Sequence, residues 1–201
     1  MFRPVFTTLP KVLSPMRFPV VSDEAPIPGA EKLDALLATK LWRNPCWFSF
    51  RINNLALQFN SAVYGWIEAE HGLLRPEFVV LYSVGLQDGT AATDIARSSG
   101  FPRNTLSRAT QKLFERQLIR RELDPHDGRS YVLRLTDAGR QIYDDAMVIM
   151  REREELMLAT LTPGEQHMLY ELLAKAIIDS PNWPATIPTS SSPSKPSKDY
   201  P

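Results

Sequence analysis

The sequence predicts a mainly α-helical (α+β) fold in which one short β-hairpin follows two closely crossing helices. Between Thr93 and Thr136, two segments with apolar residues at helical spacing are joined by a glycine turn, and two strand-like runs follow. Long amphipathic segments flank this stretch on both sides. These observations predict a winged helix-turn-helix at residues 72–136, with dimerisation helices at 30–71 and 137–179.

The two ends of the chain have a different composition from its middle. Six of the 17 prolines lie in residues 1–29 and six in residues 181–201, where serines also cluster. We therefore expect disordered tails at 1–29 and 180–201. The single cysteine excludes an intramolecular disulfide, and neither a long apolar run nor a signal-peptide pattern is found. We expect a soluble cytoplasmic protein without a membrane segment.

The N-terminal part predicts two helices, at Glu31–Trp42 and Cys46–His71. In the first, leucines share one side, and Asn44-Pro45 ends the helical pattern; they are Leu33, Leu36, Leu37 and Leu41. The second carries a continuous apolar stripe of Phe48, Ile52, Leu55, Phe59, Val63 and Trp66 and ends at Gly72. A stripe of this length needs a large apolar partner.

The next segments predict the helix-turn-helix. Pro76 opens a helix that closes near Gly85–Gly89, with Phe78, Val79, Leu81, Tyr82 and Leu86 expected to be buried. A short helix follows at Thr93–Ser99, with Thr93 as its N-cap and Ile95 and Ala96 as its apolar contact. Gly100 suits the tight turn because glycine tolerates positive φ, and Pro102 suits the first turn of the following helix.

The helix from about Pro102 to Gln117 has two unlike faces. Leu106, Ala109, Thr110 and Leu113 recur at helical spacing and are expected in the core. The remaining face carries Arg103, Asn104, Thr105, Ser107, Arg108, Gln111 and Lys112. Arginine can pair with guanine and asparagine or glutamine with adenine in the major groove, so these residues are candidate DNA contacts.

Leu118–Leu123 and Ser130–Leu135 predict a β-hairpin. In the second run, Tyr131, Leu133 and Leu135 alternate with Val132 and Arg134. The turn formers at 124–129 make the tip. We expect Arg129 to reach the minor groove, and Asp127 to hold that guanidinium by a charge-assisted hydrogen bond.

Two more helices follow the hairpin. Thr136 is a suitable N-cap for a helix reaching about Thr160, with Ile142, Ala146, Ile149 and Leu156 expected to face inward. Thr162-Pro163-Gly164-Glu165 is a capping box that starts the last helix. Its stripe comprises Leu169, Leu172, Leu173, Ala176 and Ile177. Such stripes outside the helix-turn-helix are most simply buried against a second copy of the chain.

The charges are distributed unevenly. Residues 97–134 contain nine Lys or Arg and four Asp or Glu, whereas residues 140–180 contain four basic and eight acidic residues. The whole chain has a formal net charge of zero. A basic module within a neutral chain is what phosphate binding requires.

Residues 127–136 (DGRSYVLRLT) and 104–108 (NTLSR) resemble the wing and recognition-helix patterns of the MarR family of bacterial transcriptional regulators. The resemblance covers roughly residues 45–178. It implies a C₂ homodimer that represses transcription from a pseudo-palindromic operator, at the nucleoid, and that leaves the DNA when a small, often aromatic, ligand binds. By the same resemblance, Tyr64, Trp66, Arg75 and Tyr82 lie in the helices that border the ligand crevice.

Other kinds of site have weak support. His71, His126 and His167 are scattered without ligand spacing, and no nucleophile motif or phosphate loop occurs, so we expect no metal, no cofactor and no catalysis. Two alternatives stay open. Cys46 near the start of its helix could sense oxidants, as in OhrR-type relatives, although its register differs by about one turn. The winged helix could instead be a protein-interaction scaffold, which would favour an acidic or apolar outer face.

Overall fold

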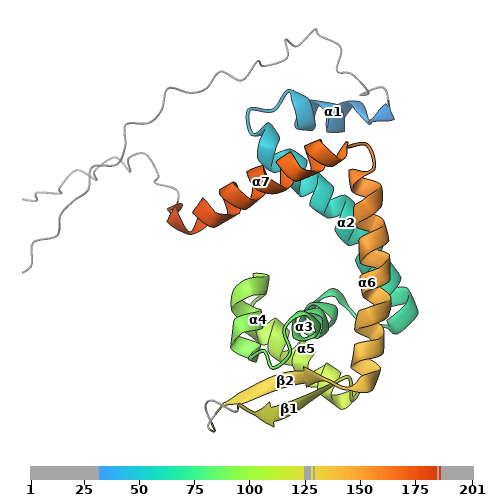
Figure 1. Cartoon of the computed structure of the whole chain (residues 1–201), viewed down its shortest axis with the longest axis vertical. Coiled ribbons are helices and arrows are strands. Elements are labelled where there is room, and N and C mark those ends of the chain that lie inside the picture. Colours follow the sequence, from blue (N-terminus) through green and yellow to red (C-terminus); the bar gives the residue numbers. More distant parts are fainter. Residues whose placement is uncertain (1–31, 125–127, 129, 185, 187–201) are drawn as a thin grey trace, which may run out of the picture. The chain divides into compact units, whose positions relative to one another are not determined.

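The computed structural model describes residues 32–124, 128, 130–184 and 186 of the 201-residue chain. These residues divide into two compact units, the first ending at Met150 and the second beginning at Arg151. In chain order the elements are α1 (Ala35–Trp42), α2 (Trp47–His71), α3 (Arg75–Leu86), α4 (Ala92–Ser99), α5 (Arg103–Glu115), β1 (Ile119–Leu123), β2 (Tyr131–Leu135), α6 (Asp137–Leu158), α7 (Pro163–Asp179) and the 3₁₀ helix η2 (Ser180–Asn182) (Figure 1). The mainly helical fold with one small antiparallel sheet confirms the predicted fold class.

Helix α1 is shorter than predicted, because its N-cap is Asp34, three residues after the predicted start at Glu31. The Asp34 carboxylate accepts hydrogen bonds from the N–H groups of Leu36 (2.9 Å) and Leu37 (3.0 Å), so the helix begins at Ala35 and not at Glu31. Arg51 of α2 donates a hydrogen bond to the Leu41 carbonyl at 2.9 Å. Its guanidinium also lies 5.0 Å and 4.8 Å from the ring centroids of Trp42 and Trp47, which ties α1 to α2.

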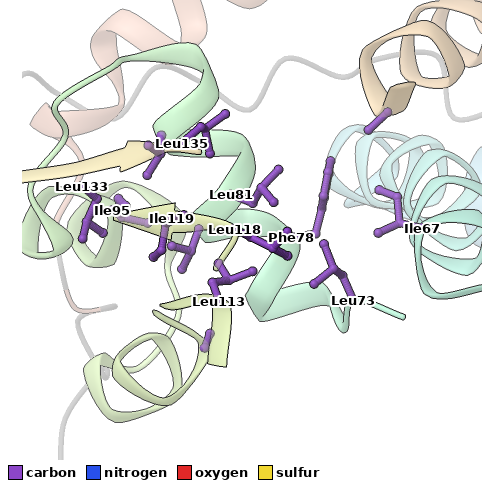
Figure 2. Close-up of a cluster of buried hydrophobic side chains, with 14 of the residues drawn as sticks. Ile67, Leu73, Phe78, Leu81, Ile95, Leu113, Leu118, Ile119, Leu133 and Leu135 are labelled. Carbon is purple, nitrogen blue, oxygen red and sulfur yellow. The ribbon is translucent and has the colours of Figure 1, made fainter. Parts of the chain in front are cut away.

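The core of the first unit is built around α3 and α5. Leu106, Ala109, Thr110 and Leu113 of α5 are all buried, as predicted. Side chains from α2, α3, α4, α5 and both strands converge on one apolar cluster, whose labelled members in Figure 2 are Ile67, Leu73, Phe78, Leu81, Ile95, Leu113, Leu118, Ile119, Leu133 and Leu135. The burial of one face of α5 in this cluster leaves its polar face to the solvent.

Glycines end two of the helices as predicted. Gly72 closes α2 with φ 60° and Gly100 closes α4 with φ 71°, both in the left-handed region. The end of α2 is further bound by Arg116, whose guanidinium donates to the carbonyls of His71 (2.8 Å) and Gly72 (3.0 Å). The turn after α5 therefore anchors the end of the long helix.

Three local predictions in the helix-turn-helix were wrong. Thr93 is not the N-cap of α4, because Ala91 occupies that position: the chain leaves the sheet at Thr90 and the helix starts at once. Pro102 is the N-cap of α5 and not its first residue. Leu86 is 59% exposed at the end of α3 and does not join the core.

The hairpin pairs β1 with β2 in the register Ile119↔Leu135 to Leu123↔Tyr131. The segment after α3 adds a bridge, in which Gly89 N–H donates to the Leu133 carbonyl (3.2 Å) and Leu133 N–H to the Thr90 carbonyl (3.0 Å). The predicted alternation holds only in part, because Val132 is also buried, outside the main cluster. Helix α5 ends at Glu115, short of Gln117, which has a φ of 58° in the following turn.

The start of α6 is packed closely on that turn. The Thr136 hydroxyl accepts a hydrogen bond from Gly139 N–H (3.1 Å) and donates one to the Gln117 carbonyl (2.7 Å), so it caps α6 as predicted. A Cβ atom at Gly139 would lie 2.0 Å from the Leu118 carbonyl oxygen. Only glycine lets the helix approach the backbone so closely.

The second unit contains the end of α6, α7 and η2. The capping box at Thr162 and Glu165 is present as predicted. Leu156 of α6 and Leu172 and Ile177 of α7 were expected to be covered, but they are exposed. The same is true of Phe48, Ile52 and Leu55 in the first half of the α2 stripe, whereas Val63 of that stripe is buried. Parts of these apolar stripes are therefore exposed to the solvent in the single chain.

We predict that Gly139→Ala lowers the free energy of unfolding by about 1–3 kcal/mol, because the new Cβ must push away the Leu118 backbone. Gly65→Ala is the matched control: nothing lies within 4 Å of a Cβ there, in the middle of α2. That change should stabilise the protein by about 0.5–1 kcal/mol. Urea unfolding measures both, and equal effects at the two glycines would contradict the close packing of α6.

Candidate nucleic-acid interface

The outward face of α5 is polar from Arg103 to Lys112, and the exposed Phe114 follows in the last turn. Arg103, Asn104, Ser107, Arg108, Gln111 and Lys112 are exposed and Thr105 is half-buried. Asn104 accepts a hydrogen bond from Thr105 N–H (2.9 Å), and the Gln111 amide donates to Glu115 (2.9 Å). The structure thus brings seven of the nine predicted DNA contacts onto one helix. The other two, Asp127 and Arg129, lie outside the described residues, as does His126.

Most cations around this helix already have an intramolecular partner. Arg97 pairs with Asp94, Lys112 with Glu77, Arg120 with Glu122, and Arg134 with both Glu122 and Asp88; Arg116 binds two carbonyls and Arg121 lies over the Phe114 ring. Arg103 and Arg108 differ from these. Neither guanidinium is hydrogen-bonded or ion-paired to any residue that the structure describes. Two uncommitted cations therefore point outward from α5.

Lys112 is the predicted contact with the most definite partner. Its ammonium lies 2.9 Å from a carboxylate oxygen of Glu77, a side chain of α3 that is buried. The sequence pattern of α5 did not reveal this pair, because the two residues are 35 positions apart. Glu77 also bonds the start of its own helix, where its second oxygen accepts from Leu74 N–H at 3.0 Å.

The base of the wing is held by a charge network. Glu122 of β1 accepts hydrogen bonds from Arg120 and Arg134, and these two bonds hold the pKa of its carboxyl below the ordinary value. The Glu122 carboxylate and the Asp88 carboxylate in turn raise the pKa of Arg134. Through Asp88 the network joins β2 to the loop after α3, which supports the hairpin.

The four predicted ligand-binding residues are only partly brought together. Arg75 lies between two rings, 5.0 Å from the centroid of Tyr64 and 5.6 Å from that of Phe101. Tyr64 contacts Phe78 edge-on, and Phe78 contacts Tyr82 (centroids 6.1 and 5.8 Å apart). Among the described residues, the Arg75 guanidinium has neither a carboxylate partner nor a hydrogen bond.

Trp66 stands apart from this aromatic row, since it packs edge-on against His71 at 5.2 Å. The sequence interpretation placed Phe78 in the core but did not single out Phe101 or Tyr143, whose ring centroid lies 6.0 Å from that of Tyr82. One sequence signal could have identified Phe101. An aromatic residue in the turn between the two helices is expected to pack against a neighbouring side chain.

The other candidate sites have little structural support. Cys46 is exposed at the N-cap of α2, and its side chain makes no capping hydrogen bond. The described residues contain no group of three or more His, Cys, Asp or Glu side chains arranged to hold a metal ion. Within the same residues, no helix combines the length and the apolar character needed to span a bilayer.

The fold matches that of known transcription regulators. A model of the MarR family matches residues 71–130. YxaD of Bacillus subtilis, an uncharacterised HTH-type transcriptional regulator, is 32% identical over 110 residues, which cover 53% of this chain and 77% of YxaD. NicR of Pseudomonas putida, an HTH-type transcriptional repressor, is 24% identical over 127 residues, covering 63% of this chain and 80% of NicR. The crystal structure of a MarR-family regulator from Silicibacter pomeroyi is 26% identical with a TM-score of 0.60, covering 70% of this chain and 92% of that one.

The winged helix, with its basic module and exposed polar helix, defines a DNA-binding transcription regulator, and the relatives are regulators and not enzymes. More closely, the chain belongs to the MarR family.

We predict that Glu122 titrates below its ordinary value of 4.5 and that Arg120→Gln raises its pKa towards that value, because the largest hydrogen-bond contribution is lost. A depressed carboxyl pKa stabilises the folded hairpin above pH 4.5, and this contribution disappears as the pH falls through the folded-state pKa. Carboxyl ¹³C NMR titration measures the shift, with the exposed Arg97→Gln as control. An ordinary pKa for Glu122 in the unchanged protein would contradict the network.

Proposed function

We propose that the protein is a homodimeric repressor that binds a pseudo-palindromic operator and releases it when a small, possibly aromatic, ligand binds. The observation that carries this proposal is the pair of guanidinium groups, Arg103 and Arg108, that point outward from α5 without a partner among the described residues. An exposed helix of this kind, next to a β-hairpin wing, suits the major groove. Among the described residues, Arg103 and Arg108 have no carboxylate partner to leave before they meet a phosphate or a base.

In this proposal the residues of α5 make two kinds of contact with DNA, to base edges and to phosphates. Arg103, Asn104, Ser107, Arg108 and Gln111 read base edges or hold phosphates, and half-buried Thr105 lies beside them. Arg129 enters the minor groove with Asp127 holding it, as the wing pattern of the sequence suggests. A regulator acting in this way would work at the nucleoid in the cytoplasm.

The proposed dimer explains the uncovered apolar stripes. Phe48, Ile52 and Leu55 on α2, and Leu172 and Ile177 on α7, are exposed in one protomer. Apolar stripes on long helices are seldom left in water, and a twofold interface would cover the same residues in both copies. Two α5 helices would then approach neighbouring turns of the major groove.

The proposed effector site centres on Arg75. A guanidinium stacked between Tyr64 and Phe101 keeps its N–H edge available, and that edge suits a carboxylate. The neighbouring Tyr82 would provide aromatic surface, while Trp66 would border the site from α2. A ligand that binds better to the DNA-free arrangement weakens operator binding, with a coupling of typically about 1–3 kcal/mol.

The test of DNA recognition is Arg108→Ala. Loss of one bidentate arginine–base contact should cost about 1–3 kcal/mol of binding free energy and relax the base preference at one position of each half-site. The probe is the duplex immediately upstream of the protein's own gene, or the best-bound duplex from a randomised pool, with affinity measured by fluorescence anisotropy. Lys175→Ala, which removes the same charge from α7, is the control and should bind as the unchanged protein does. Equal affinities for Arg108→Ala and Lys175→Ala would overturn the assignment.

A second test addresses the effector, with benzoate as the probe. We expect Arg75→Gln to weaken benzoate binding by about tenfold or more, because a charge-assisted hydrogen bond is lost. Operator binding without benzoate should stay near that of the unchanged protein. Isothermal titration calorimetry measures the first quantity, with Lys40→Gln, an exposed cation on α1, as control. If Arg75→Gln bound benzoate as tightly as Lys40→Gln, Arg75 would not be the carboxylate site.

A further inference from the structure

Glu77 is the only buried ionisable side chain among the residues that the structure describes. Both of its carboxylate oxygens are used. One accepts a hydrogen bond from Leu74 N–H at 3.0 Å, at the start of α3, and the other meets the Lys112 ammonium at 2.9 Å, in the last turn of α5. A buried carboxylate is stable only when it is paired in this way.

The two bonds of Glu77 have different consequences. The residue at the N-cap of α3 is Leu74, which has no side-chain acceptor, so Glu77 supplies the cap from the third helical position. The bond to Lys112 then connects this cap to α5. Glu77 therefore joins the first turn of one helix to the last turn of the other, across the core that both helices share.

Lys112 lies one helical turn after Arg108 on the same side of α5. Both side chains line a surface cavity together with Leu74, Pro76, Glu77, Thr105 and Ala109. Within that cavity the two cations differ, because Arg108 has no described carboxylate partner and Lys112 has one. Of these two cations, only Arg108 therefore offers a phosphate a charge that no described carboxylate already neutralises.

We infer that Glu77 is a positioning residue for DNA recognition: it holds α5 at a defined position against α3 and withholds Lys112 from the phosphate backbone. The inference rests on the proposed function. It replaces the expectation that Lys112 is itself a DNA contact. The protein then reads its site with fewer phosphate contacts than its basic residues suggest, which favours specific over non-specific binding.

The experiment measures the dependence of DNA affinity on salt between about 50 and about 200 mM, for the best-bound duplex from a randomised pool and for a scrambled duplex. Each phosphate contact contributes about 0.9 to the slope of log K against log salt, hence about 1.8 for a symmetric dimer. Lys112→Gln, which can still donate to Glu77, should leave the slope unchanged.

Glu77→Gln is the decisive variant, because its single amide oxygen cannot serve both Leu74 and Lys112. We expect the slope to become steeper by about 1.8 as Lys112 is released, and the ratio of specific to scrambled affinity to fall by about fivefold or more, the size of one lost base contact. In Glu77→Gln/Lys112→Gln the slope should return to that of the unchanged protein. A merely structural role for Glu77 would lower thermal stability, measured by circular dichroism, without steepening the slope.

The possible failures are distinguishable. If the unchanged protein binds no duplex at low salt, the proposed function fails. If it binds, and the slope of Glu77→Gln equals that of the unchanged protein, the inference about Glu77 fails while the proposed function stands. A shallower slope for Lys112→Gln would also overturn the inference, because Lys112 would then be a phosphate contact, and this outcome is readable even where Glu77→Gln does not fold.

Discussion

The burial of one face of α5 is the constraint on which the rest of the structure depends. Leu106 and Leu113 enter the same apolar cluster as Phe78 and Leu81 of α3, and the hairpin closes the cluster from the other side. Because a helix turns by 100° per residue, burying this face leaves the residues between at the surface. Helix α5, which we propose reads the DNA, is thus oriented by its apolar side, and this burial alone turns its polar side to the solvent.

Whether a basic residue of the winged helix can bind a phosphate depends on the contacts that it already makes within the protein. Its sequence contains nine basic residues, yet six of them are occupied by carboxylates, carbonyls or a ring within the described structure. Arg116 illustrates the difference, since it holds the end of α2 and is not available to a phosphate. A count of basic residues predicts the sign of the electrostatic potential around the winged helix. It does not predict how many phosphates the protein can neutralise.

Sequence patterns over a few residues predicted the helices and their ends correctly in several places. They could not predict contacts between segments that are far apart in the sequence. The spacing of Leu106 and Leu113, the glycine at 100 and the capping box at Thr162 each depend on neighbours within a few residues, and each was confirmed. Thr93 was misassigned as a cap because the chain before it is held in the sheet by a bridge to β2, which no local pattern reveals. The Glu77–Lys112 pair depends on how two helices pack, and the apolar spacing of α2 did not reveal that the first half of its stripe is exposed in the single chain.

The first turn of α3 connects the two proposed sites. Arg75, where the effector carboxylate would bind, is stacked between Tyr64 of α2 and Phe101 of the helix-turn-helix, and two residues later Glu77 holds Lys112 of α5. A ligand that draws the Arg75 guanidinium away from either ring changes the contacts of the turn to which α5 is attached. Coupling requires that this turn have different contacts in the DNA-bound and ligand-bound arrangements, and the stacking of Arg75 and the pairing of Lys112 are the contacts that would differ. On this argument Glu77→Gln, which detaches α5 from the turn, should weaken the effect of benzoate on operator binding more than it weakens benzoate binding itself.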